Sequence, residues 1–194
     1  MDAIFPNEIE KKLGELEKEL LSKKKELTKL RRSLPHEEIE DYILYGSQGE
    51  RVRLSELFGG RNELLLIHNM GKGCTYCTMW ADGFNGILPH LENKAAFALV
   101  SPDDPETQRK FAESRDWKFR MLSCKGTSFA KDLGFQGEDG GYWPGVSTFQ
   151  KNADGRIFRV SRDFFGPGDN YCSVWHLFDL LPNGPGDWQP KYAY

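Results

Sequence analysis

The chain has 194 residues, with 26 Lys and Arg against 29 Asp and Glu, and a formal net charge of −3. Its 39% hydrophobic and 28% charged residues exclude a largely disordered chain, and its length fits one domain with a sizeable core. A mildly acidic chain without a clustered basic face argues against a nucleic-acid partner. No apolar run approaches the roughly 20 residues that cross a bilayer, so we expect no membrane partner either.

The redox compartment follows from two further features. The first residues, Met1 to Pro6, lack the basic start and the apolar stretch of a signal peptide. The four cysteines are too few and too unevenly spaced for a disulfide framework. Together these features predict a cytoplasmic protein with reduced thiols.

Residues 1–35 are predicted to form a separate N-terminal amphipathic helix. Asn7 is suited to cap its start, and Pro35 ends it. Apolar side chains recur in steps of three or four, with Lys23 at the one missing place, and they are Ile9, Leu13, Leu16, Leu20, Leu27, Leu30 and Leu34. Such a seam packs against the chain's own domain or pairs with a second copy, so a homodimer is one of two alternatives.

Residues 36–182 show a mixed pattern of strands and helices. Predicted strands cover 42–45, 51–54, 63–70, 96–100, 119–122, 146–150 and 156–160, and predicted helices begin near 74 and cover 104–116, 127–133 and 174–181. The early strand–helix–strand crossover predicts parallel pairing, and the late hairpin predicts an antiparallel edge. The pattern therefore predicts an α/β, thioredoxin-like sandwich with a mixed central sheet flanked by helices. Residues 183–194 are predicted to form an extended tail.

Cys74 and Cys77 form the one motif with strong chemical content. They follow a predicted buried strand and open the next helix, where unpaired amides and the helix dipole stabilise a thiolate. The nearby Lys72 would act in the same direction. Because the second cysteine returns to the same helix face within disulfide reach, the spacing predicts Cys74 as nucleophile and Cys77 as resolving cysteine.

Two other interpretations of the cysteine pair stay open. A metal could recruit His68, His90 or Cys124 as further ligands, although no second motif has the tight spacing of a structural zinc site. The pair could also be two ordinary buried cysteines. We expect no metal and no other cofactor.

Several motifs, taken together, resemble a known family. They are Tyr42 with Gly46, Leu57–Arg61, His68-Asn69-Met70, Cys74–Cys77, Trp80–Gly86, Pro89-His90-Leu91, Val100-Ser101, Asp116–Phe119, Pro144–Ser147 and Leu177–Pro182. Over nearly the whole chain the sequence is similar to a bacterial thioredoxin-like family, domain of unknown function 899. The resemblance implies a thioredoxin-like fold of the peroxiredoxin type and leaves the activity open. Thr75-Tyr76 departs from the Pro-Ser more usual between the cysteines, so the reduction potential does not transfer.

The same resemblance implies further site residues. Pro144 would be a cis proline facing the cysteines, with Trp143 and Gly145 lining a groove that holds an extended substrate; an ordinary trans turn proline is the alternative. Lys72, Thr75, Tyr76 and Trp80 would line the same groove, unless Trp80 belongs to the core.

Four polar or thiol positions keep more than one interpretation. His68, six residues before Cys74, would accept the Cys77 proton or be a histidine bonded within the core. Asp82 is a cap or a site carboxylate. Cys124 and Cys172 are interpreted as incidental buried thiols rather than resolving cysteines, with a Cys74–Cys124 relay as the alternative.

The leading functional hypothesis is a thiol–disulfide oxidoreductase acting on a protein disulfide or a small thiol substrate, with an unidentified electron donor. A thiol peroxidase is one alternative, although peroxiredoxins carry a threonine where this chain has Gly71, three residues before Cys74. A binding or assembly module without catalysis, in which the cysteines hold metal or nothing, is the other.

Overall fold

The computed structural model describes residues 7–194, which divide into two compact units, one ending at His36 and one spanning Glu37–Tyr194. The first unit contains helix α1 (Glu8–Arg32). The Asn7 side chain caps it by accepting a hydrogen bond of 3.0 Å from the Glu10 backbone N–H. The predicted helix and its cap are confirmed. The segment interpreted as lacking a signal peptide, Met1 to Pro6, lies outside the described residues.

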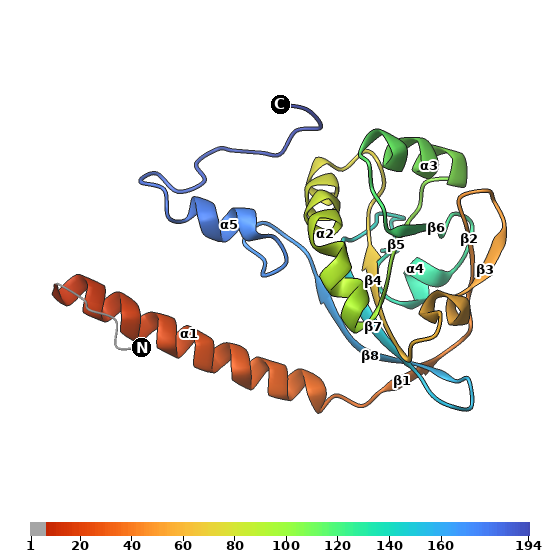
Figure 1. Ribbon diagram of the computed structural model, residues 1–194, viewed down its shortest axis with the longest axis horizontal. Helices are drawn as coiled ribbons and strands as arrows, with labels where there is room; N and C mark the ends of the chain where they lie inside the picture. The colour runs from red at the N-terminus through yellow and green to blue at the C-terminus, as the bar shows by residue number, and fades with distance from the viewer. Residues whose placement is uncertain (1–6) are drawn as a thin grey trace. The chain divides into compact units, whose positions relative to one another are not determined.

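The second unit is built on one mixed sheet. Its strands are β1 (Glu37–Ile39), β2 (Ile43–Tyr45), β3 (Arg51–Arg53), β4 (Glu63–His68), β5 (Ala96–Ser101), β6 (Arg120–Ser123), β7 (Gly145–Lys151) and β8 (Ile157–Phe164). Their order is β1-β8-β7-β4-β5-β6-β2-β3 (Figure 1). The pairs β4–β5 and β5–β6 are parallel, and the remaining pairs are antiparallel. The predicted thioredoxin-like sandwich with a mixed sheet is confirmed.

The helical segments of this unit are η1 (Leu54–Phe58), α2 (Thr75–Lys94), α3 (Pro105–Ser114), α4 (Phe129–Asp132) and α5 (Ser173–Phe178). At the start of α3 the Asp104 side chain accepts from the Thr107 N–H at 3.0 Å and Pro105 occupies the first turn, two features that favour a helix start. α4 and α5 are shorter than the predicted helices.

The strands separate two layers of the hydrophobic core. Leu64 and Leu66 of β4 pack with η1 and α4, whereas Leu65 and Ile67 pack with α2. This alternation follows from the two-residue period of a strand, whose successive side chains point to opposite faces. Each layer therefore has its own set of buried residues, and a side chain on β4 belongs to one layer only.

Helix α2 runs unbroken through Gly83, Gly86 and Pro89. Neither glycine is required by close packing, because nothing lies within 4 Å of a Cβ built at either position. The helix is fixed instead by its opposite face, where Trp80, Ala81, Phe84 and Leu88 are buried at helical spacing. That face holds the first turn of α2, with the cysteine pair, against the sheet.

The residues after α5 form neither helix nor strand. They pack on the second unit nonetheless: the Trp188 ring lies 6.2 Å from Trp175 and 4.9 Å from Phe178, centroid to centroid. Over the part of the chain that the structure describes, no helix combines the length and the apolar character needed to cross a membrane.

Candidate functional site: a dithiol at the start of helix α2

The loop between β4 and α2 is held by side-chain bonds to its backbone. The Asn69 side chain accepts from the Gly71 N–H at 2.8 Å and donates to the Cys77 carbonyl oxygen at 3.3 Å. From the end of β5, Asp103 accepts from the Lys72 N–H at 2.7 Å. Gly71 has φ +100, and a Cβ there would lie 2.9 Å from the Asp103 carboxylate, so only glycine fits this turn.

This loop delivers Cys74 to the N-cap position of α2. The Cys74 sulfur accepts a hydrogen bond of 3.0 Å from the Cys77 backbone N–H. Cys74 is partly exposed, whereas Cys77 is 2% exposed. The structure thus brings the two thiols together, with one of them open to solvent.

The two thiols have opposite proton affinities. A hydrogen bond from the Cys77 thiol, reinforced by the backbone N–H groups of Cys77 and Tyr76, lowers the pKa of Cys74 to about 7 in spite of its partial burial. The same thiol–thiol hydrogen bond, followed by burial and by charge on Cys74, raises the pKa of Cys77 well above its usual range. A large fraction of Cys74 is therefore thiolate near neutral pH, while Cys77 keeps its proton.

The residues between and after the cysteines lie against an aromatic cluster. The Tyr76 ring lies 6.1 Å from Trp175 and 6.2 Å from Trp80. Trp80 is buried and packs on Phe165 at 5.4 Å. Trp80 therefore belongs to the core beneath the dithiol, and Thr75 and Tyr76 form its partly exposed rim.

Lys72 contributes its backbone to the site. Its N–H donates to Asp103, and its carbonyl oxygen accepts a hydrogen bond of 2.9 Å from the Tyr192 phenol. The expected electrostatic help from its ammonium is not among the main causes of the lowered Cys74 pKa, which are hydrogen bonds.

His68 does not face the dithiol. It shares the β4 face of Leu64 and Leu66, its ring stacks on Phe135 at 3.6 Å, and its Nε2 bonds to the Ser147 hydroxyl at 2.9 Å. Burial, and then the charge of Arg159, lowers its pKa to about 3, so the imidazole is neutral. Because Cys77 packs in the other core layer, the hypothesis that His68 accepts the Cys77 proton does not fit this geometry.

The Trp143–Pro144 peptide bond is trans, so the cis proline implied by the family resemblance is wrong for this structure. The Trp143 N–H donates a hydrogen bond of 2.9 Å to the Phe135 carbonyl oxygen, and the Pro144 carbonyl oxygen accepts one of 2.9 Å from the Phe165 N–H. These two bonds hold the backbone before and after the Trp143–Pro144 peptide bond. Trp143 is 57% exposed.

Gly145 follows as the first residue of β7 and pairs with His68 of β4. A Cβ at Gly145 would lie 2.3 Å from the Asp163 carbonyl oxygen and 2.5 Å from the Phe135 ring. Its role is therefore close packing of β7 against its neighbours, and no contact in the structure joins it to the dithiol.

A pocket of about 480 Å³ reaches the dithiol motif at Tyr76, the residue before Cys77. Tyr76 forms one wall, and Trp175 and Trp188 form others. The carboxylates of Asp179 and Asp187 also line it, and no Lys, Arg or His is among its lining residues. Its aromatic and acidic lining suits an organic cation.

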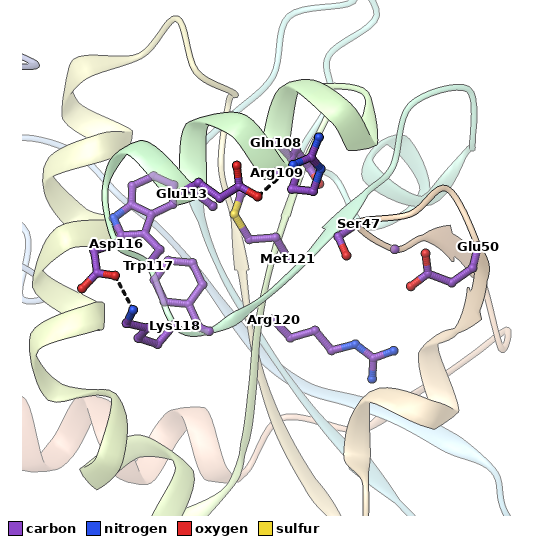
Figure 2. Close-up of a pocket in the computed structure, with 13 residues that line it drawn as sticks. Ser47, Glu50, Gln108, Arg109, Glu113, Asp116, Trp117, Lys118, Arg120 and Met121 are labelled. Atoms are coloured by element: carbon purple, nitrogen blue, oxygen red, sulfur yellow. Dashed lines mark hydrogen bonds and ion pairs between the residues drawn. The ribbon is translucent and has the colours of Figure 1, made fainter.

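A second pocket of about 410 Å³ lies between α3, β6 and the β2–β3 turn (Figure 2). Arg109 pairs with Glu113 along its rim, and Lys118 pairs with Asp116. None of the residues predicted for the site lines this pocket, so it is separate from the dithiol.

The other cysteines are buried elsewhere. Cys124 lies in the opposite core layer from Cys77, and burial raises its pKa to about 12. Cys172 lies at the start of α5, and burial raises its pKa as well. Within residues 7–194, no three His, Cys, Asp or Glu side chains converge as metal ligands would. Neither a relay through Cys124 nor a metal centre is supported by the geometry.

Sequence reasoning missed Asn69 and Asp103, which shape the loop before Cys74. A usable signal existed, because both residues follow neighbouring parallel strands, and the carboxyl ends of such strands meet at one edge of a sheet. Asp82, interpreted from the sequence as a cap or a site carboxylate, is neither a helix cap nor a neighbour of the cysteines by hydrogen bond; it accepts from Arg115 and Trp117.

A family model of bacterial proteins of unknown function (DUF899) matches residues 7–193. The chain belongs to this family. No curated protein matched the sequence of this DUF899 chain.

Solved structures similar to this DUF899 member show its fold. Reduced Prx3 in complex with hydrogen peroxide, from Vibrio vulnificus, has 18% identity and a TM-score of 0.55, covering 70% of this chain and 90% of that one. The mitochondrial 2-Cys peroxiredoxin of Plasmodium falciparum has 15% identity and a TM-score of 0.54, over 69% and 83%. A peroxiredoxin-like protein from Aquifex aeolicus has 15% identity and a TM-score of 0.52, over 66% and 74%. At these identities the similarity establishes a peroxiredoxin-type thioredoxin fold.

Proposed function

We propose that this protein is a cytoplasmic thiol–disulfide oxidoreductase in which Cys74 attacks a disulfide and Cys77 resolves the product. The observation that carries the proposal is the hydrogen-bonded cysteine pair at the start of α2, with the pKa of Cys74 lowered to about 7 and that of Cys77 raised. A partly exposed thiolate beside a buried, protonated thiol is the arrangement that two-step disulfide exchange needs.

The reaction balances without a cofactor. The Cys74 thiolate attacks one sulfur of a disulfide, forms a mixed disulfide and releases the first thiolate. The Cys77 sulfur then attacks the Cys74 sulfur, its proton passes to the released thiolate, and the second thiolate leaves. Two electrons have moved from the dithiol to the substrate, and a second thiol must later reduce the Cys74–Cys77 disulfide.

The first step itself activates Cys77. While Cys74 is a thiolate, it accepts the hydrogen bond from the Cys77 thiol, and its negative charge opposes a second negative charge on Cys77. Both effects raise the Cys77 pKa. A Cys74 sulfur bound in a mixed disulfide has lost that charge, so only burial still opposes ionisation of Cys77. A separate proton acceptor such as His68 is therefore unnecessary.

A thiol peroxidase is the second candidate. The Vibrio vulnificus structure described as a complex with hydrogen peroxide has the same fold, and a thiolate such as Cys74 is the species that peroxides oxidise. Consumption of hydrogen peroxide by the reduced protein would favour this candidate, particularly if it exceeded the rate of disulfide reduction.

The deciding experiment is a redox titration in defined thiol–disulfide buffers, followed by alkylation and peptide mass spectrometry. We expect a reversible Cys74–Cys77 disulfide with a midpoint between about −120 and −280 mV. Cys74→Ser should abolish disulfide reduction, Cys77→Ser should trap the mixed disulfide, and the buried control Cys124→Ser should behave as wild type. Failure of Cys74 and Cys77 to join at any potential would refute the proposal.

A further inference from the structure

The C-terminal residues cross the loop that leads into the dithiol. The Tyr192 phenol donates its hydrogen bond to the carbonyl oxygen of Lys72, two residues before Cys74. The Tyr192 ring packs edge-on against Phe111 of α3, with centroids 6.2 Å apart. Burial, followed by the charges of the two cysteines, raises the pKa of Tyr192, which places the phenol within electrostatic range of the dithiol.

An anchor from α2 holds this segment in place. The Arg115 guanidinium donates to the Tyr192 backbone carbonyl oxygen and, through two nitrogens, to the Asp82 carboxylate. The Trp117 indole N–H donates to the same carboxylate at 2.8 Å. Forked, charge-assisted bonds of this kind fix geometry as well as adding stability. Asp82, eight residues after Cys74 on the same helix, is therefore a positioning residue for the C-terminal segment.

The other end of the segment is fixed by packing. Trp188 lies against Trp175 and Phe178, and Trp188 belongs to the same core layer as Cys77. Residues 188–192, here called the C-terminal strap, are thus attached at one end by the packing of Trp188 and at the other by the hydrogen bonds of Tyr192 to Arg115 and Lys72.

The strap affects large and small substrates differently. A disulfide within a protein arrives on a polypeptide, and extended polypeptides bind by hydrogen bonding to backbone groups of a site. At Lys72 that backbone acceptor is already occupied by Tyr192. A protein substrate has to displace the strap, so its apparent affinity falls with the fraction of molecules in which the strap is docked. A small disulfide needs to reach only the partly exposed Cys74.

We propose that the C-terminal strap makes the dithiol selective for low-molecular-weight disulfides over disulfides in proteins, with Tyr192 as the specificity-determining residue. This inference rests on the proposed function and names its class of substrate. Tyr192 forms no bond in the reaction; it controls which disulfides approach Cys74.

The test compares single-turnover reduction of hydroxyethyl disulfide and of insulin by pre-reduced protein. Tyr192→Ala should raise the second-order rate constant for insulin about tenfold, the effect of losing one hydrogen bond, and change that for hydroxyethyl disulfide less than about twofold. Tyr192→Phe, which loses the same hydrogen bond but keeps the ring against Phe111, should give a similar increase. Leu180→Ala, at an 81% exposed position before the strap, is the control and should equal wild type.

The outcomes separate the two proposals. A thermal unfolding curve for each variant checks that it folds, which is expected because Tyr192 is 41% exposed. A ratio of insulin to hydroxyethyl disulfide rates that is the same in wild type, Tyr192→Phe and Tyr192→Ala would overturn the selectivity while leaving the oxidoreductase intact. Wild-type protein that reduces neither substrate would overturn the proposed function, and the selectivity with it.

Discussion

Replacing Cys77 by alanine tests the origin of the Cys74 thiolate. The hydrogen bond from the Cys77 thiol is the largest cause that lowers the Cys74 pKa from 9.0 to about 7. Cys77→Ala removes that donor and keeps the backbone N–H groups of residues 76 and 77 that also point at the sulfur. We therefore expect the Cys74 pKa to rise part of the way back, by at least about one unit.

The size of the effect follows from the thiolate fraction. At pH 7 a thiol with a pKa of about 7 is about half ionised, whereas one with a pKa of about 8 is about one-tenth ionised. Alkylation of Cys74 by iodoacetamide at pH 7 should then slow about fivefold in Cys77→Ala. Measuring that rate from pH 5 to 10 by peptide mass spectrometry gives the pKa of both proteins directly.

Cys124→Ser is the control, since it removes a buried thiol from the opposite core layer and should leave the Cys74 profile unchanged. An alkylation pKa near 7 that persists in Cys77→Ala would show that backbone amides alone hold the thiolate. A wild-type value near 9 would refute the reasoning altogether, because Cys74 would then be an unactivated thiol.

Three further predictions concern the rest of the site. In denaturant titrations from pH 6.5 down to pH 5, the free energy of unfolding of the wild type should fall by up to about 1.4 kcal/mol per pH unit, because His68 takes up its proton below pH 6.5 in the unfolded chain and only near pH 3 in the folded one. If the same pH dependence persists in His68→Gln, another group causes it. Gly145→Ala should destabilise by about 1–3 kcal/mol in the same assay, whereas Gly86→Ala, in open space on α2, should be neutral or stabilising; equal effects would contradict the packing at Gly145. The reduced protein should react faster with cystamine, a disulfide with ammonium ends, than with the anionic dithiodipropionate, and Asp187→Asn should reduce the difference between the two rate constants. Equal rate constants in the wild type would mean that the acidic pocket does not attract the substrate.

Much of the fold was predictable because its signals are local. Apolar runs identify most of the strands, helical spacing identifies α3, and the spacing of Cys74 and Cys77 identifies the dithiol. The sequence did not predict β1, because this strand is only three residues long and two of them, Glu37 and Glu38, are exposed, so it shows no hydrophobic alternation. It is a strand only because β8 offers it a partner.

The errors at the site have a different cause. The two-residue period of β4 does predict that His68 shares a face with Leu66, but it cannot say which face the following helix covers. That depends on the crossover from β4 to β5, which places α2, and so Cys77, on the other side. The contact between Lys72 and Tyr192 joins residues 120 positions apart, and no local pattern encodes it.

The pairing of β1 with β8 also bears on how the chain folds as it is synthesised. Glu37 lies opposite Arg159, so β1, at the start of the second unit, can pair only after β8, near the end of that unit, has been synthesised. At about 5–20 residues per second, the partner of β1 emerges from the ribosome roughly 6–24 s after β1 itself. Within residues 7–194 β1 pairs only with β8, and β8 is held by β7, so β1, the first strand of this sheet in chain order, is among the last to enter it.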